Sequence, residues 1–496
     1  MTTVRATRAV LVKDSISIST SKDPEFTSLQ NVVTILSHLV TVDVQAYERV
    51  TYMKLMLPRV EHVIKCVNNT PGSFENLSLS VKLDLIRLFE VYGMVKLTRL
   101  NSKEDQKDAE VYLKMSLDDL WREIVRLSNS DLRSFDDLMN QNSDDSSPEK
   151  NRAKQIIDAC QKAGKALHKS QFDISAHFHS IPQIWARGCG IPLNEDRMAE
   201  WDKFLQSCLK HEIEKNQVQL PLPQYYLFLI RRLVSIMYSL GRVMFYDAED
   251  SSPDRHDYFR RLADITHYVC EFYLEDTGKD DVSFFLLGRA NAIDVRLKRT
   301  GKSIEEDKRK ILSEIRVLQE RTVRYVKGGF HMENVGVDQS NVWCNFLDIT
   351  ALRSLVRSNA KRWRLLNEEE KKSQLQWGDS CCESLLQKAE NTLKTLKISS
   401  SCYVYVGKYY AAKESYYQAI VMFDKALGLR LSEVDKTKFF PWVCYNYARA
   451  VSVSKSKAFQ EKAKKYCKDA LILKKDISND LACRLDGQLT FALTQF

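Results

Sequence analysis

Residues that interrupt secondary structure are scarce in this chain, which has 10 prolines and 16 glycines among 496 residues. The stretches between them carry apolar side chains at a spacing of about 3.6 residues, as in residues 81–97 and 112–127. So few turn-forming residues exclude a β-sandwich or a barrel of many short strands. We therefore predict an all-α protein, an irregular α-solenoid built as an array of helical hairpins.

Polar interruptions divide the chain into regions. The segment "NQNSDDSSPEKNR" has the composition of an exposed linker. The predicted regions are a flexible N-terminal arm at 1–25, a helical region at 26–139, the linker at 140–152, a middle region of helical hairpins at 153–380 and a C-terminal helical region at 381–496.

Two segments of the middle region have recognisable helical patterns. Residues 225–245 and 257–275 flank a polar loop and are expected to form the two arms of a helical hairpin. Residues 303–326 place apolar side chains seven positions apart, from Ile304 to Tyr325. A coiled coil is one interpretation, but three heptads favour packing against neighbouring helices of the same chain.

The sequence predicts an intracellular protein, nuclear or cytoplasmic, that is neither secreted nor membrane-spanning. The most apolar stretch contains Arg231 and Arg232 at its centre, where charges are costly in a bilayer, so we expect a buried helix. The first 15 residues have no apolar run of signal-peptide length. The 12 cysteines are scattered without a CxxC pair, which favours reduced thiols.

The most informative spacing lies in residues 403–429. An aromatic-x2-aliphatic-Gly-x2-Tyr pattern is followed by Ala-x3-Phe-x2-Ala, with Tyr403, Gly407, Tyr410, Ala419, Phe423 and Ala426 at the defining positions. The small residues allow two helices to cross closely, and the aromatic rings fill the space between them. These intervals resemble the tetratricopeptide repeat, a 34-residue helix–turn–helix unit. The pattern departs at Glu414, where a turn glycine is common, and at Leu431, where proline is common.

A second, looser copy follows. Trp442, Tyr445 and Asn446 restart the pattern, although Arg449 stands where tyrosine is expected. Its second helix has Ala463, Cys467 and Ala470 at the same intervals as Ala419, Phe423 and Ala426. Upstream, residues 381–397 are expected to close a preceding repeat, with Ala389 and Leu393 as contacts. The resemblance covers about residues 403–473.

The resemblance implies a stacked array whose concave groove binds peptides or helices of partner proteins. In this register Lys408, Ala412 and Tyr447 would face the groove. Lys408 is expected to pair with an acidic partner residue. For Tyr447, contact with a partner and internal packing remain alternatives. The set of Lys, Asn and Arg residues that clamps a chaperone tail is not complete here.

Irregular helical arms of this kind also resemble chromosome-segregation and meiotic scaffolds, including the non-catalytic arm of separase-like proteins. The stretch "WVCYNYARAV" at 442–451 carries this similarity. It implies a setting in a chromosome-segregation or cell-division complex.

Nucleic-acid binding is the alternative function. The chain has a net charge of +9, and lysines concentrate in residues 295–316 and 455–475. Lysines on a helix usually mark its solvated face, which is the favoured interpretation. A basic surface for nucleic acid would be formed by Lys462, Lys464, Lys465 and Lys468.

Catalytic and metal-binding patterns are weak. "RTGKS" at 299–303 ends like a phosphate loop, but Arg296 replaces the required glycine. No hydrolase, zinc-protease or kinase motif occurs. Four ligands of zinc type are present but widely separated, and we expect them to be exposed or hydrogen-bonded: His177, His179, Cys208 and His211. We therefore expect no enzyme activity, no metal and no cofactor.

The sequence ends with an apolar segment that contains Leu489, Phe491 and Leu493. Ends of repeat arrays need a polar outer face, so this segment either folds back on the array or is covered by a partner. We expect a partner to dock there. The predicted function is a non-catalytic scaffold that binds one or more proteins, in its groove or at this end.

Overall fold

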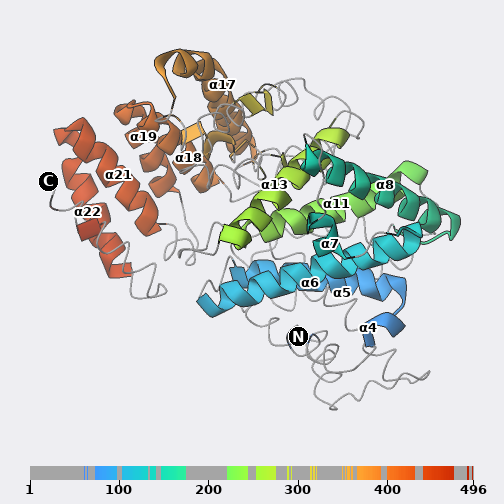
Figure 1. The fold of residues 1–496 in the computed structure, drawn as a ribbon. Coiled ribbons are helices and arrows are strands. Elements are labelled where there is room, and N and C mark those ends of the chain that lie inside the picture. The colour runs from blue at the N-terminus through green and yellow to red at the C-terminus, as the bar shows by residue number, and fades with distance from the viewer. Residues whose placement is uncertain are drawn as a thin grey trace. The chain divides into compact units, whose positions relative to one another are not determined.

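The computed structural model describes helices in two compact units, Met1–Glu275 (unit 1) and Asp276–Phe496 (unit 2), which are treated separately. Every element in the part of the chain that the structure describes is helical, which confirms the all-α prediction (Figure 1). The described ranges are 73–97, 103–131, 134–140, 147–174, 221–243, 253–274, 366–392, 399–429 and 440–473, together with isolated positions outside them.

Unit 1 is a bundle in which helices far apart in sequence pack together. Helix α6 packs on α5, α8 and α11, and α8 also contacts α11 and α13 (Figure 1). Its described helices are α4 (Ser73–Asn76), α5 (Leu79–Val95), α6 (Lys103–Ser128), α7 (Phe135–Asn140), α8 (Pro148–Lys169), α11 (Leu222–Gly241) and α13 (Pro253–Tyr273).

Helices α11 and α13 pack on one another, as the predicted helical hairpin requires. Helix α8 packs on both, and its Gly164 lies close to the backbone of α11 at Tyr226. A Cβ atom at Gly164 would lie 2.8 Å from the amide nitrogen of Tyr226 and 2.9 Å from its Cα atom. Glycine, which has no Cβ atom, therefore occupies the position where the backbones of α8 and α11 come close together.

The structure differs from the sequence prediction around the expected linker. Helix α8 begins at Pro148, which occupies the first helical position, where the missing amide hydrogen carries no cost. Arg152, at the end of the predicted linker, is only 6% exposed. Because α6 packs on α8 and unit 1 extends to Glu275, the regions on either side of 140–152 belong to one compact unit.

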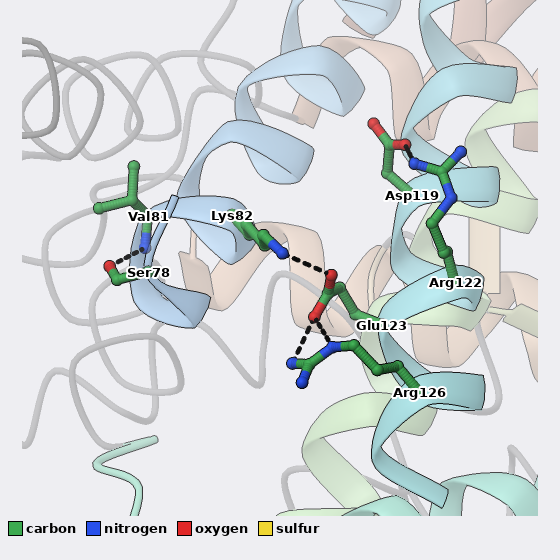
Figure 2. A network of polar contacts seen from close by, with 7 residues as sticks. All are labelled: Ser78, Val81, Lys82, Asp119, Arg122, Glu123 and Arg126. Carbon is green, nitrogen blue, oxygen red and sulfur yellow. Dashed lines mark hydrogen bonds and ion pairs between the residues drawn. The ribbon is translucent and has the colours of Figure 1, made fainter. Parts of the chain in front are cut away.

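Charged side chains are buried between α5 and α6. Lys82 of α5 donates a hydrogen bond to Glu123 of α6 at 2.9 Å, and their side chains are 9% and 4% exposed. Figure 2 shows Arg126 binding the other oxygen of the same carboxylate, at 2.7 Å. Glu123 thus joins a buried ammonium to a more exposed guanidinium.

A second buried polar group links α5 to α11. Glu90 of α5 accepts hydrogen bonds from the hydroxyls of Ser235 and Ser239 on α11. Burial raises the pKa of Glu90, while the hydrogen bond from Ser235 and the charge of Arg232 oppose that rise. Helix α5 therefore carries polar side chains into the interior, rather than only on a solvated face.

Unit 2 is a stack of helices in which each packs on the next. Helix α18 contacts both its own partner α19 and α21, the first helix of the following hairpin. Contact between first helices is the packing of a helical repeat array, so unit 2 contains stacked helical hairpins. Its described helices are α17 (Glu368–Thr392), α18 (Ser399–Ala412), α19 (Tyr416–Gly428), α21 (Phe440–Ser454) and α22 (Lys457–Leu473).

The predicted repeat positions lie at the contacts between these helices. Tyr403, Ala419, Phe423 and Ala426 are all 5% exposed or less and share one core. A Cβ atom at Gly407 would lie 2.8 Å from the ring of Phe423, so the glycine leaves the space that this ring occupies. The spacing of small and aromatic residues therefore predicted the position of the hairpin. Its physical basis is that each small residue leaves space for a ring on the facing helix.

Helix α18 ends at a left-handed residue. Glu414 has a φ of 63°, and the amide of Ser415 donates to the carbonyl of Tyr410 at 2.9 Å. This is the Schellman ending, in which glycine is the favoured residue. The same arrangement ends three other helices of the described chain, again without glycine, at Asn129, Gln171 and Lys455.

Replacing Glu414 with glycine should stabilise unit 2. Glycine adopts positive φ without the steric cost that Glu414 bears, so we expect the free energy of unfolding to rise by about 0.5–1 kcal/mol. Chemical denaturation followed by circular dichroism measures the change. Glu414→Ala removes the same charge but keeps a Cβ atom, and it should give no such gain. Equal stabilisation by both substitutions would contradict this explanation.

Of the three apolar residues named at the C-terminal end, the structure describes Leu489. Leu489 is fully buried in the core of α18, α19, α21 and α22, so this residue folds back on the array and is not free to receive a partner. Phe491 and Leu493 lie outside the described residues. The expected docking surface therefore cannot include Leu489, because its side chain already contributes to the core.

Several predictions fall on residues that the structure does not describe. These include the arm at 1–25, the segment at 299–303, most of 303–326, and the four zinc-type residues His177, His179, Cys208 and His211. Within the described ranges, no group of three or more His, Cys, Asp or Glu residues is placed to hold a metal. No described helix has the length and hydropathy needed to cross a bilayer.

Candidate protein-binding surface

The three predicted groove residues do not lie on one surface. Lys408 and Ala412 are partly exposed and one turn apart on α18. Tyr447 of α21 is fully buried, and its ring packs edge-on against Tyr466 of α22 at 5.4 Å. The prediction that Tyr447 faces the groove is therefore wrong, because this ring fills the space between the two helices of its own hairpin.

Partly exposed side chains instead form stripes along the first helices of the hairpins. On α18 they recur at Ser401, Tyr405, Lys408 and Ala412. On α21 the same spacing of three or four residues brings out Trp442, Tyr445, Asn446 and Arg449. Residues at these intervals share one side of a helix, so each helix presents one polar and aromatic side.

The stripes of α18 and α21 are in contact. The ammonium of Lys408 lies 3.5 Å from the centroid of the Trp442 ring, a cation–π contact across the two hairpins. The rings of Tyr405 and Trp442 are 6.2 Å apart at an interplanar angle of 63°. Lys408 therefore lies on the predicted surface and also joins α18 to α21.

A third helical stretch adds two arginines. Arg353 and Arg357 are helical residues one turn apart, and both are partly exposed. Arg353 donates a hydrogen bond to the hydroxyl of Ser401 at 3.1 Å. The guanidinium of Arg357 lies 5.9 Å from the ring centroid of Tyr405. These contacts join the arginines to the stripe of α18. We call the combined surface the cationic face; it consists of Arg353, Arg357, Tyr405, Lys408, Trp442, Tyr445 and Arg449.

The charges of the cationic face have one sign. Helices α18 and α21, of 14 and 15 residues, contain no aspartate or glutamate. Lys408 and Arg449 are their contributions to the face, and Arg353 and Arg357 add two further cations. Clustered lysine and arginine side chains raise the local electrostatic potential.

A pocket of about 580 Å³ lies beyond Ala412, where the start of α17 meets the turn between α18 and α19. Trp363, Lys371, Lys372 and Lys413 are among its lining residues. The ammonium of Lys413 binds Asp379 at 2.6 Å and lies within 6.0 Å of three ring centroids, those of Trp363, Tyr409 and Tyr410. Ala412, one turn after Lys408, is among the lining residues, and the ammonium of Lys413 already has an internal carboxylate.

The predicted basic surface on α22 is partly neutralised. Lys462 pairs with Asp424 at 2.6 Å, and Lys464 pairs with Glu461 at 2.8 Å. The hydrogen bond to Asp424 raises the pKa of Lys462. Lys465 and Lys468 are exposed. Two of the four predicted lysines are therefore engaged within unit 2, which weakens the nucleic-acid interpretation.

Two cysteine side chains of unit 2, Cys402 and Cys467, are fully buried. Burial raises the pKa of Cys402 on α18 and of Cys467 on α22 to about 11. At neutral pH both are protonated, and a protonated, buried thiol is a poor nucleophile. Their position in the core gives them a packing role.

Sequence reasoning found Lys408 and missed most of its neighbours. Arg449 was recognised only as a departure from the repeat pattern, and Tyr405, Arg353 and Arg357 carried no motif. One signal was available in the sequence, since two successive first helices, 399–412 and 440–454, lack any acidic residue. The absence of acidic residues from both helices indicates that any charge they present is positive.

Comparison with known proteins gives no family. No protein-family model matches the chain, and no curated protein matches it. Among solved structures, a chain described as a circular tandem repeat protein with novel repeat topology and enhanced subunit contact surfaces is 13% identical. The comparison covers 95% of this chain and 96% of that one with a TM-score of 0.26. A TM-score of this size carries no argument, so the helical-repeat assignment rests on the packing described above.

Proposed function

We propose that this protein is a non-catalytic scaffold that holds a partner protein on the cationic face of unit 2. The observation that carries the proposal is a partly exposed surface of three adjoining helical stretches, with aromatic rings and charges of one sign. Aromatic and arginine side chains are enriched at protein interfaces, where they supply much of the binding free energy. Helical repeat arrays present such surfaces without catalytic chemistry.

The narrower form of this proposal is a role in a chromosome-segregation or cell-division complex, in the nucleus or cytoplasm. It is supported by the resemblance of residues 442–451 to helical scaffolds of that setting. The same residues form most of α21 and supply Trp442, Tyr445 and Arg449 to the cationic face. The resemblance and the proposed surface therefore coincide in one helix.

Affinity purification of the full-length tagged protein from dividing cells tests the proposal. We expect at least one protein to co-purify in a near-stoichiometric amount, measured by quantitative mass spectrometry, and to remain bound after nuclease treatment. A segregation or division factor among the partners would support the narrower form. Recovery of nucleic acid with proteins that nuclease releases would favour the alternative, and no stoichiometric partner under native conditions would contradict the scaffold function.

A further inference from the structure

We propose that one side of α8 in unit 1 binds the phosphate backbone of a nucleic-acid duplex without reading its base sequence. The surface belongs to a different unit from the cationic face and from the predicted basic surface on α22, so the inference goes beyond the proposed function. We call it the α8 lysine face; it consists of the exposed residues Lys150, Lys154, Lys162, Lys165 and Lys169.

The five lysines form a line along one side of the helix. At 3.6 residues per turn they fall within about 120° of its circumference, and from Lys150 to Lys169 the helix rises about 28 Å. The opposite side carries Ile156, Ala163 and Leu167, which are buried in unit 1, where α8 packs on α6, α11 and α13. Packing of the apolar side therefore holds the lysines in fixed positions along a rigid element.

The structure leaves these charges without internal partners. No ion pair or hydrogen bond joins the five ammonium groups to the described part of the chain. Helix α8 contains two acidic residues, and one of them, Glu149, pairs with Arg152 at 3.6 Å. The other, Asp158, is exposed among the lysines, so the face keeps a surplus of positive charge.

Stability of the helix does not account for this arrangement. Lys150 is the third residue of α8, in the first turn, where the helix dipole disfavours a cation. Lys154 follows it by four residues, and Lys169 follows Lys165 by the same interval, so like charges repel one another along the helix. Anionic groups bound along the face would relieve that repulsion.

The other side chains of the face indicate the class of ligand. Every exposed residue of α8 is polar or charged. The core of a protein interface contains apolar and aromatic side chains, a helix that binds a bilayer inserts an apolar side, and single-stranded nucleic acid stacks its bases on aromatic rings. The α8 lysine face offers none of these, because the apolar side of α8 is buried within unit 1.

A duplex matches what the face does offer. Its backbone is a regular row of phosphates, which lysines bind through charge alone and without regard to sequence. Because successive phosphates of one strand are about 3.4 Å apart along the duplex axis, a line of about 28 Å spans about eight base pairs. The phosphate row is common to DNA and RNA duplexes.

Fluorescence anisotropy with the full-length protein tests the inference. The probe is a fluorescein-labelled DNA duplex of about sixteen base pairs, roughly twice the expected span. A second duplex of unrelated sequence should bind within about twofold, whereas one strand alone and a polyglutamate peptide of equal length should bind at least about tenfold more weakly. An RNA duplex of equal length, measured in parallel, shows which kind of duplex the face prefers. If each lysine neutralises one phosphate, the affinity should fall about 500-fold between about 50 and 200 mM salt.

Removal of charge from the protein localises the binding. The double variant Lys162→Gln with Lys165→Gln should weaken duplex binding by at least about tenfold and make its dependence on salt less steep. Lys465→Gln with Lys468→Gln is the matched control, because it removes two exposed lysines at the same spacing from α22. It should alter the affinity by less than about twofold. Glutamine and lysine have similar helix propensities, and thermal melting of each variant verifies that it is folded.

Three results would overturn the inference: no binding of either duplex at low salt, binding of the single strand or the polyglutamate peptide as tight as that of the duplex, or equal weakening by the two double variants. These failures remain distinct from failure of the proposed function. If a stoichiometric protein partner co-purifies after nuclease treatment while the duplex does not bind, the scaffold function stands and only the role of the α8 lysine face is wrong.

Discussion

Replacing Gly164 with alanine should destabilise unit 1 by about 2–3 kcal/mol, the upper part of the range for overpacked helix crossings. The added Cβ atom would meet the backbone of Tyr226 at 2.8 and 2.9 Å. A backbone cannot turn away as a long side chain can, so α8 and α11 would have to separate. Urea denaturation followed by circular dichroism measures the loss.

The same substitution at Gly428 provides the matched control. Gly428 is the last residue of α19, and a Cβ atom there would have nothing within 4 Å. Alanine has a higher helix propensity than glycine, so Gly428→Ala should be neutral or slightly stabilising. Similar losses at both positions would show that the close approach to Tyr226 is not the cause.

Removing the Glu123 carboxylate should cost about 3–5 kcal/mol, as for other buried ion pairs that lose one partner. Glu123→Ala leaves the Lys82 ammonium, which is 9% exposed, without the carboxylate that lies 2.9 Å away (Figure 2). The cost comes mainly from that desolvated charge. Equilibrium unfolding in urea, with the wild type as reference, gives the difference in free energy.

Two comparisons show whether burial of the charge is responsible. Glu461→Ala breaks an exposed pair with Lys464 of nearly the same length, 2.8 Å, and should cause no measurable loss. The double variant Lys82→Met with Glu123→Leu removes both charges and should recover most of the stability lost in Glu123→Ala. A double variant as unstable as the single one would assign the loss to packing.

Local spacing was enough to predict the hairpin of α18 and α19. Its contacts join residues close in sequence, such as Gly407 and Phe423, so a pattern of small and large residues records them directly. The turn was also readable, since the position of Glu414 requires a left-handed conformation whichever residue occupies it. Predictions of this kind depend on interactions within one hairpin.

Contacts between distant helices were not predictable in the same way. Lys82 and Glu123 are 41 residues apart, and nothing in either segment identifies the other as its partner. Tyr445 and Tyr447 are both aromatic residues of α21, yet Tyr447 is fully buried against Tyr466 of α22 and Tyr445 is only partly buried. Helical period alone places a residue on one side of a helix but does not say which neighbour covers that side.

The candidate surface combines features that could be predicted from the sequence with features that could not. The sequence indicated Lys408 through the repeat register, and it also displayed two first helices without acidic residues. It did not indicate that Arg357, Tyr405 and Trp442 would lie in a row, because that row forms only when separate helical stretches stack. The charge of each helix could therefore be predicted from the sequence, but the contacts that assemble the surface could not.

The position of Lys408 would couple partner binding on the cationic face to the packing between two hairpins of unit 2. Its ammonium lies over the Trp442 ring and so joins neighbouring hairpins, and Lys408 also belongs to the proposed binding surface. A partner group that draws the ammonium off the ring would loosen the junction between α18 and α21. One that binds it in place would tighten the junction. Thermodynamic linkage makes this reciprocal, so a substitution that stabilises the arrangement of α18 and α21 favoured by the partner also raises the affinity for that partner.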